Sequence, residues 1–134
     1  MRVTRGACAA VLPPVALTIG NFDGVHKGHQ AILERVGSEA ARRALASCVL
    51  TFEPHPREFF APQSAPTRLT SLREKLELLA ARGIGRTHLL HFDRTLAAVP
   101  AEAFVEKLLC HTLRTRWILI GEDFRFGTGR AGDV

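Results

Sequence analysis

A chain of 134 residues is long enough to bury one substantial core and too short for two full domains. Apolar residues make up 46% of it and charged residues 23%, a globular balance that excludes general disorder. No apolar run approaches the roughly 18 residues of a transmembrane helix. The N-terminus also lacks the apolar stretch of a signal peptide, so we expect a soluble protein of the cytoplasm.

The 18 Lys and Arg residues outnumber the 13 Asp and Glu residues, which gives a formal net charge of +5. The basic residues are scattered singly or in pairs such as Arg42 and Arg43, and aromatic residues do not interleave with them. This pattern disfavours a nucleic-acid interface and suits small anionic ligands such as nucleotides. Cys8, Cys48 and Cys110 are isolated, so we expect buried apolar thiols and neither a zinc site nor a disulfide framework.

The first predicted strand covers residues 15–19, an apolar run that ends at Gly20. A helix is predicted over 30–46, because apolar residues recur there at helical spacing with charged residues between them. Its inward-facing residues are expected to be Ile32, Leu33, Val36, Ala40 and Leu45. A second buried strand is predicted over 47–52, and a proline-rich loop follows it.

The next helix is predicted over 71–82, where Ser71 and Glu74 have the spacing of a capping box and Gly83 stands at the C-cap. Its leucines are expected to line the buried face: Leu72, Leu76 and Leu79. A strand over 87–92, a helix over 100–110 and a strand over 117–120 follow. The inward residues of that last helix are expected to be Phe104, Val105 and Leu108.

Strands that alternate with helices indicate βαβ units, and apolar strands without alternation indicate a sheet covered on both faces. The expected fold is therefore α/β, a Rossmann-like parallel sheet flanked by helices on both faces, in a single domain over 1–134. Ligands of such sheets bind beyond the carboxyl ends of the strands. Segments 20–29, 53–68, 92–99 and 121–134 each follow a predicted strand, so we expect them to gather at that edge.

Residues 20–29 read GNFDGVHKGH and join the first strand to the first helix. Glycines at 20, 24 and 28 allow tight turns and a close approach of backbone N–H groups to a ligand. The start of a helix offers unpaired N–H groups and a positive dipole end, which favour phosphate. His26 and His29 flank that start and can donate hydrogen bonds to phosphate oxygens whose charge grows in a transition state.

Other interpretations of residues 20–29 are weaker. A glycine-rich turn with two surface histidines is the plainest of them. A zinc site is disfavoured because the two histidines are three residues apart and no third ligand is evident. The phosphate loops of P-loop and dinucleotide-binding proteins are absent, since neither G-x-x-x-x-G-K-[ST] nor G-x-G-x-x-G occurs here.

His26-x-Gly28-His29 resembles the H-x-G-H signature of the nucleotidyltransferase superfamily. The longer string 20–29 resembles the N-terminal FMN adenylyltransferase domain of bacterial bifunctional riboflavin kinase/FAD synthetases. Three more stretches carry the same resemblance: TFEPHP at 51–56, RLT at 68–70 and GEDFRFG at 121–127. The resemblance extends from about Leu17 to the end of the chain.

The resemblance implies an enzyme that transfers the adenylyl group of ATP to FMN and releases FAD and pyrophosphate. It implies that no protein nucleophile takes part, and that Mg²⁺ is held mainly by the ATP phosphates, with no protein metal ligand expected. His26 and His29 would be the catalytic residues. The ATP site would comprise Gly20, Phe22, Asp23, Gly24, His26, Gly28, His29, Gly121 and Asp123.

On the flavin side, the resemblance implies contacts from Phe52, Pro54, His55 and Pro56. From the residues alone, His55 is equally an exposed residue of a loop that prolines make rigid. Asp123 is similarly open to a second interpretation, the capping of local N–H groups in a turn.

Two alternative functions are open. Members of the family continue to an S-S-T-x-x-R motif and a riboflavin kinase domain, whereas this sequence ends at Val134. We therefore expect a domain that is partial at its C-terminus, without riboflavin kinase activity. The first alternative is a module that binds nucleotide or flavin without turnover, and the second is a nucleotidyltransferase that acts on another small phosphate.

Overall fold

One sheet of five parallel strands organises the described part of the chain, residues 1–5, 12–22, 27–53, 71–91 and 93–120 of a computed structural model. The strands are β1 (Arg2–Arg5), β2 (Val15–Ile19), β3 (Ala46–Phe52), β4 (Arg86–Leu90) and β5 (Thr115–Ile120). Their order is β1-β4-β3-β2-β5, and every neighbouring pair is parallel. The predicted α/β architecture is confirmed.

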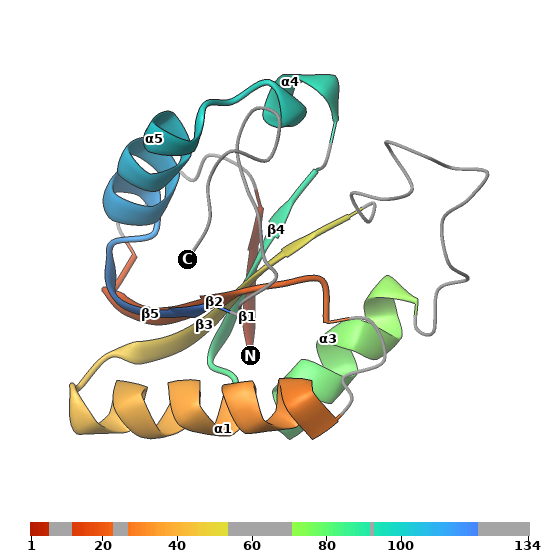
Figure 1. The fold of residues 1–134 in the computed structure, drawn as a ribbon. Helices are drawn as coiled ribbons and strands as arrows, with labels where there is room; N and C mark the ends of the chain where they lie inside the picture. Colours follow the sequence, from red (N-terminus) through yellow and green to blue (C-terminus); the bar gives the residue numbers. More distant parts are fainter. Residues whose placement is uncertain (6–11, 23–26, 54–70, 92, 121–134) are drawn as a thin grey trace.

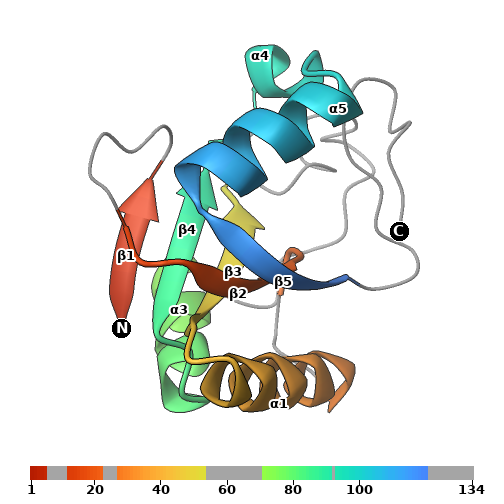
Figure 2. The same cartoon turned by 90° about the vertical axis from the view of Figure 1, so that its left-hand side faces the viewer.

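Helices cover both faces of the sheet (Figures 1 and 2). One face carries α1 (Lys27–Arg42) and α3 (Leu72–Ala81). The other carries α4 (Arg94–Ala97), α5 (Ala101–Ala103) and the π-helix η1 (Phe104–Thr112). Within the described ranges, no helix has both the length and the apolar character needed to cross a bilayer.

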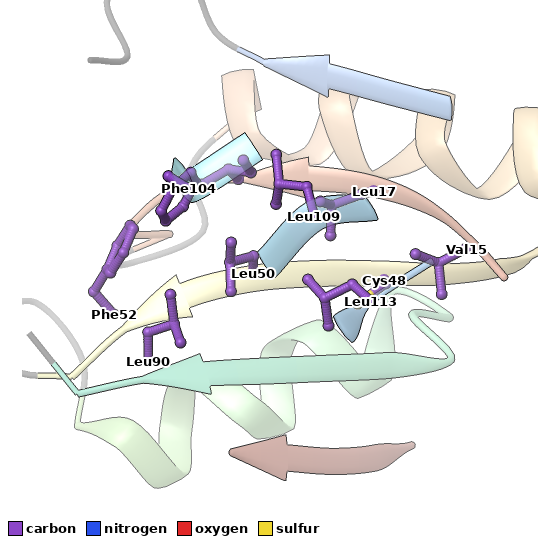
Figure 3. Packing of buried hydrophobic residues seen from close by; sticks show 10 residues of the cluster. Val15, Leu17, Cys48, Leu50, Phe52, Leu90, Phe104, Leu109 and Leu113 are labelled. Carbon is purple, nitrogen blue, oxygen red and sulfur yellow. The ribbon is translucent and has the colours of Figure 1, made fainter. Parts of the chain in front are cut away.

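The core lies in two layers, because successive side chains of a strand point to opposite faces and helices cover both. The layer beneath η1 is shown in Figure 3 and comprises Val15, Leu17, Ile19, Cys48, Leu50, Phe52, Leu90, Phe104, Leu109 and Leu113. The layer against α1 and α3 comprises Ala16, Phe22, Leu33, Val36, Ala40, Val49, Leu79 and Ile84. Because both faces of the sheet are covered, β2, β3 and β4 have buried side chains on each face and show no alternation of apolar and polar residues.

The strand order changes direction between β2 and β5. From β2 the chain moves through α1 to β3 and through α3 to β4, always toward the same side of the sheet. After β4 it returns across the opposite face and places β5 on the far side of β2. In open parallel sheets, ligands bind beyond the carboxyl ends of the strands at this kind of switch point. The carboxyl ends of β2 and β5 are therefore where a site is to be sought.

β1 is an element that the sequence does not predict. Its four residues include two arginines and form no apolar run, so they resemble a loop. The strand pairs with β4, and its Thr4 lies opposite His88. Thr4 Oγ1 and His88 Nδ1 are 2.6 Å apart, and the His88 side chain is fully buried. A short, charged strand is typical of a sheet edge.

The third helix differs from its prediction over 100–110. Residues from Phe104 onward form a π-helix, whose hydrogen bonds span five residues and whose turn is wider than that of an α-helix. Phe104 and Leu109 are buried five residues apart, and Leu113 follows after four more. The inward position predicted for Val105 is wrong, because this residue is 38% exposed.

The first helix ends at Arg42, four residues before the predicted end at 46. Ala44 adopts a left-handed conformation with φ of 54°. The Leu45 N–H donates to the Ala40 carbonyl at 2.8 Å and the Ala44 N–H to the Ala41 carbonyl at 3.3 Å. These two bonds are the Schellman arrangement, in which alanine occupies the position that glycine prefers.

Two of the three cysteines lie among the described residues, and only one of them matches the prediction. Cys48 is fully buried in β3, and this burial raises the pKa of its thiol. Cys110 is exposed on η1, so its predicted burial is wrong. The reason is the wide π-helical turn, which directs the neighbouring Leu109 into the core instead. Cys8 lies outside the described residues.

Candidate functional site

The segments after three strands begin at one edge of the sheet, as the sequence predicts. Gly20 follows β2, and its N–H donates to the carbonyl of Leu50 in β3 at 3.1 Å. Glu53 follows β3, and its N–H donates to the carbonyl of Leu90 in β4 at 3.0 Å. His91 follows β4 and is exposed. These bonds extend the sheet pairing past the strand ends and fix where each segment starts.

At residues 20–22 the chain turns away from the sheet, and Phe22 enters the core (Figure 1). Phe22 has a φ of 51°, a left-handed conformation that residues other than glycine rarely adopt. Its ring is 2% exposed and packs with Leu33 of α1 and Leu79 of α3. A Cβ atom at Gly20 would lie 2.9 Å from Cε2 of this ring. Glycine at position 20 is therefore required by the Phe22 side chain itself.

The Phe22 ring also fixes the imidazole of His29. The two ring centroids are 4.9 Å apart, with the planes tilted by 51°. His29 lies in the first turn of α1 and is partly buried, and its Nδ1 atom is fully buried. A tilted aromatic pair at this distance has favourable geometry. The turn after β2 and the start of α1 are thus joined through their side chains.

The first turn of α1 has the electrostatics of an anion site. Lys27 and Gly28 are exposed there, and the turn contains no acidic residue. The helix dipole and the backbone N–H groups of the first turn favour negative charge. An imidazole, an ammonium and helix N–H groups together can bind phosphate oxygens.

The sequence model of the family described as "FAD synthetase" matches residues 9–134. The chain belongs to the FAD synthetase family. Among curated proteins, a bifunctional riboflavin kinase/FMN adenylyltransferase of Escherichia coli (strain K12) is 50% identical over 117 residues, which is 87% of this chain and 37% of the relative. The protein of the same name from Haemophilus influenzae is 42% identical over 135 residues, 99% of this chain and 44% of the relative.

The chain thus spans less than half the length of these two relatives. A solved structure, described as a macrolide-efflux protein from Streptococcus pneumoniae, aligns with a TM-score of 0.79. The alignment covers 95% of this chain and 44% of the other, at 23% sequence identity. This likeness concerns the fold alone, and it confirms the Rossmann-like α/β class.

The described residues include part of the predicted FAD synthetase site. Gly20, Phe22, Gly28 and His29 lie together at the β2–α1 junction. Phe52 ends β3, and this residue is 5% exposed in the core layer beneath η1 (Figure 3). The remaining candidates lie outside the described residues: Asp23, Gly24, His26, Pro54, His55, Pro56, Gly121 and Asp123.

Sequence reasoning missed two polar residues beside the site. Thr51 of β3 donates from Oγ1 to the Asn21 carbonyl at 3.1 Å, and Lys75 of α3 donates from Nζ to Thr51 Oγ1 at 3.3 Å. Lys75 falls at the spacing of the leucines at 72, 76 and 79, so its place on the buried stripe was a usable signal. Within the described ranges, no group of three or more His, Cys, Asp or Glu side chains has the geometry to hold a metal ion.

Proposed function

We propose that this chain binds ATP as its magnesium complex and transfers the adenylyl group to FMN, forming FAD and pyrophosphate. Membership of the FAD synthetase family supports this reaction, as do relatives whose names include FMN adenylyltransferase. The riboflavin kinase activity in those names is not part of the proposal.

The triphosphate would lie at the β2–α1 junction, beyond the carboxyl ends of β2 and β5. The order of the strands supports this position, because the switch point falls between these two strands. His26, His29 and the N–H groups of the first turn of α1 would bind phosphate oxygens. Gly20, Asp23, Gly24, Gly121 and Asp123 would border the nucleotide, and the segment with Pro54, His55 and Pro56 would border the flavin.

In the reaction, a phosphate oxygen of FMN forms a bond to the α-phosphorus of ATP. The bond from that phosphorus to the oxygen bridging to the β-phosphate breaks, and pyrophosphate leaves. Two anions must be brought together, so the protein contributes alignment and charge stabilisation, and no side chain is covalently modified. His29 would donate a hydrogen bond to a phosphate oxygen from Nε2, because its Nδ1 atom is buried.

The observation that carries the proposal is the fixed position of His29. The ring contact with Phe22 holds the imidazole at the positive end of α1, on the edge where the strand ends meet. A donor that is already in place costs no reorganisation when charge develops in the transition state. The exposed first turn of α1 supplies further donors to the same charge.

The direct test is incubation of the chain with FMN, ATP and Mg²⁺, followed by chromatographic separation of the flavins. FAD formation is the expected result. Tight binding of ATP without FAD would instead indicate a nucleotide-binding module. Transfer from CTP, or to a phosphate that is not a flavin, would indicate another nucleotidyltransferase.

A further inference from the structure

Lys75 is a buried cation that the proposed reaction does not use. It lies in the middle of α3, and its side chain is 2% exposed. Lysine is among the residues least often buried in full, because removing an ammonium from water is costly unless it is paired. A lysine retained on the buried stripe of α3 therefore calls for a role that an apolar residue cannot fill.

The ammonium of Lys75 begins a directed chain of hydrogen bonds. An ammonium only donates, so the bond of 3.3 Å between Nζ and Thr51 Oγ1 makes the hydroxyl the acceptor. The single hydrogen of that hydroxyl is then available for the Asn21 carbonyl, 3.1 Å away. These two hydrogen bonds join α3, the end of β3 and the turn after β2, which are distant in sequence.

The Asn21 carbonyl lies at the centre of the turn that positions Phe22. On one side of it, the Gly20 N–H is bound to Leu50; on the other, Phe22 is held in the left-handed region. That conformation is disfavoured for a residue with a side chain and persists only when its surroundings enforce it. The hydrogen bond from Thr51 to Asn21 fixes the peptide that precedes Phe22, and Phe22 in turn contacts His29.

We propose that Lys75 is a positioning residue, which acts through Thr51 and Asn21 to hold the Phe22 turn and thereby the imidazole of His29. Its effect on catalysis rests on the proposed function, whereas its effect on the position of His29 does not. The ammonium orients the Thr51 hydroxyl, the hydroxyl fixes the Asn21 carbonyl, and the ring of Phe22 transmits that position to His29. Lys75 touches no reacting atom in this scheme.

The position of the His29 ring can be measured without turnover. In NMR spectra the Cε1–H resonance of His29, assigned with the His29→Gln variant, reports the ring current of Phe22. We expect Lys75→Met and Thr51→Val, which keep the side-chain size, each to move this resonance toward that of an exposed histidine. Thr51→Ser, which keeps the hydroxyl, should leave the His29 resonance at its wild-type position. Lys107→Met is the matched control, since Lys107 is an exposed lysine on η1 at the opposite face.

The double variant separates a shared route from two independent effects. Lys75→Met combined with Thr51→Val should shift the His29 resonance no further than the larger single shift, because both changes interrupt the same series of hydrogen bonds. In the FAD-forming assay, each single variant should lower kcat by about 10- to 100-fold with KM for FMN almost unchanged, as expected for a misplaced donor.

The proposal is overturned if the His29 resonance is unmoved in either Lys75→Met or Thr51→Val, or if the two shifts add in the double variant. Lys75→Met keeps the length of the side chain and removes a buried charge, so we expect this variant to fold. Should it not fold, the comparison of Thr51→Val with Thr51→Ser decides. A wild-type chain that forms no FAD would refute the proposed function, while the resonance would still decide the role of Lys75.

Discussion

The ring of Phe22 occupies the space into which a side chain at Gly20 would project. The distance from the built Cβ position of Gly20 to Cε2 of Phe22 is 2.9 Å, shorter than real Cβ contacts allow. The ring cannot move away freely, because it is packed between α1 and α3. The glycine that opens the β2–α1 junction is thus required by packing, whether or not a phosphate also approaches it.

Gly20→Ala should therefore displace Phe22 and loosen its contact with His29. Overpacking of this kind costs about 1–3 kcal/mol of unfolding free energy, which urea denaturation measures. Gly37→Ala is the matched control, since nothing lies within 4 Å of its Cβ position in α1. There the same change should stabilise the chain by about 0.5–1 kcal/mol, because alanine favours a helix. Equal effects at the two glycines would contradict the packing argument.

Ala44→Gly should stabilise the chain. Alanine in the left-handed conformation costs about 1–2 kcal/mol, and glycine relieves this cost. Glycine also has more conformational freedom in the unfolded state, which offsets only part of the stabilisation. We expect a net increase of about 0.5–1 kcal/mol in the free energy of unfolding. The same substitution three residues earlier, Ala41→Gly, lies inside α1 and should lower it by about 1 kcal/mol. A loss of stability at position 44 would contradict the cap.

The two described cysteines should differ sharply in reactivity. Burial raises the pKa of the Cys48 thiol, so it stays protonated and shielded, whereas Cys110 is exposed. In a Cys8→Ser background, iodoacetamide should modify Cys110 in the folded chain and Cys48 only after urea is added. Rapid modification of Cys48 in the folded state would contradict its place in the core.

The same thiol makes stability depend on pH in the alkaline range. Because the pKa of Cys48 is raised on folding, the folded state keeps a proton that the unfolded state releases. Its contribution is present below the ordinary thiol pKa of about 8.5 and is lost as pH rises toward the folded value. Cys48→Ala should remove this part of the pH dependence, and an unchanged alkaline slope in the variant would exclude the thiol as its source.

His55→Ala tests the flavin side of the proposed site. If His55 borders the phosphate of FMN, its loss should raise KM for FMN by about 10-fold and change KM for ATP little, since one charge-assisted hydrogen bond is removed. Steady-state assays of FAD formation with each substrate varied in turn measure both constants. An equal rise in the two constants would refute the assignment of His55 to the flavin.

Local patterns predicted most of the helices and strands, but they predicted neither β1 nor the order of the strands in the sheet. The strands at β2 and β3 and the capping box of α3, formed by Ser71 and Glu74, follow from apolar runs and cap spacing. The pairing of β1 with β4 joins Thr4 to His88 across 84 positions, and no short window of sequence contains that relationship. Similarly, a left-handed Ala44 ended α1 where helix propensity favoured its continuation.

In the candidate site, too, local sequence predicted where residues lie in the elements but not which side chains they contact. Motif spacing placed Gly20 at the end of β2, as observed, and His29 beside the start of the first helix. That helix begins at Lys27, three residues before its predicted start, so His29 lies inside its first turn. The roles of Phe22 as support for His29 and of Lys75 as an anchor for the turn depend on three-dimensional contacts. A charged residue on an apolar stripe signals such a contact in sequence, although it does not identify the partner.

We propose that His29, held by Phe22 at the start of α1, binds the phosphates of a nucleotide. Calorimetric titration of the chain with ATP and with adenosine, in wild type and in His29→Gln, measures this directly. We expect wild type to bind ATP at least about 10-fold more tightly than adenosine, and His29→Gln to lose most of that preference. A full preference for ATP in the variant, or equal binding of ATP and adenosine by wild type, would contradict the account.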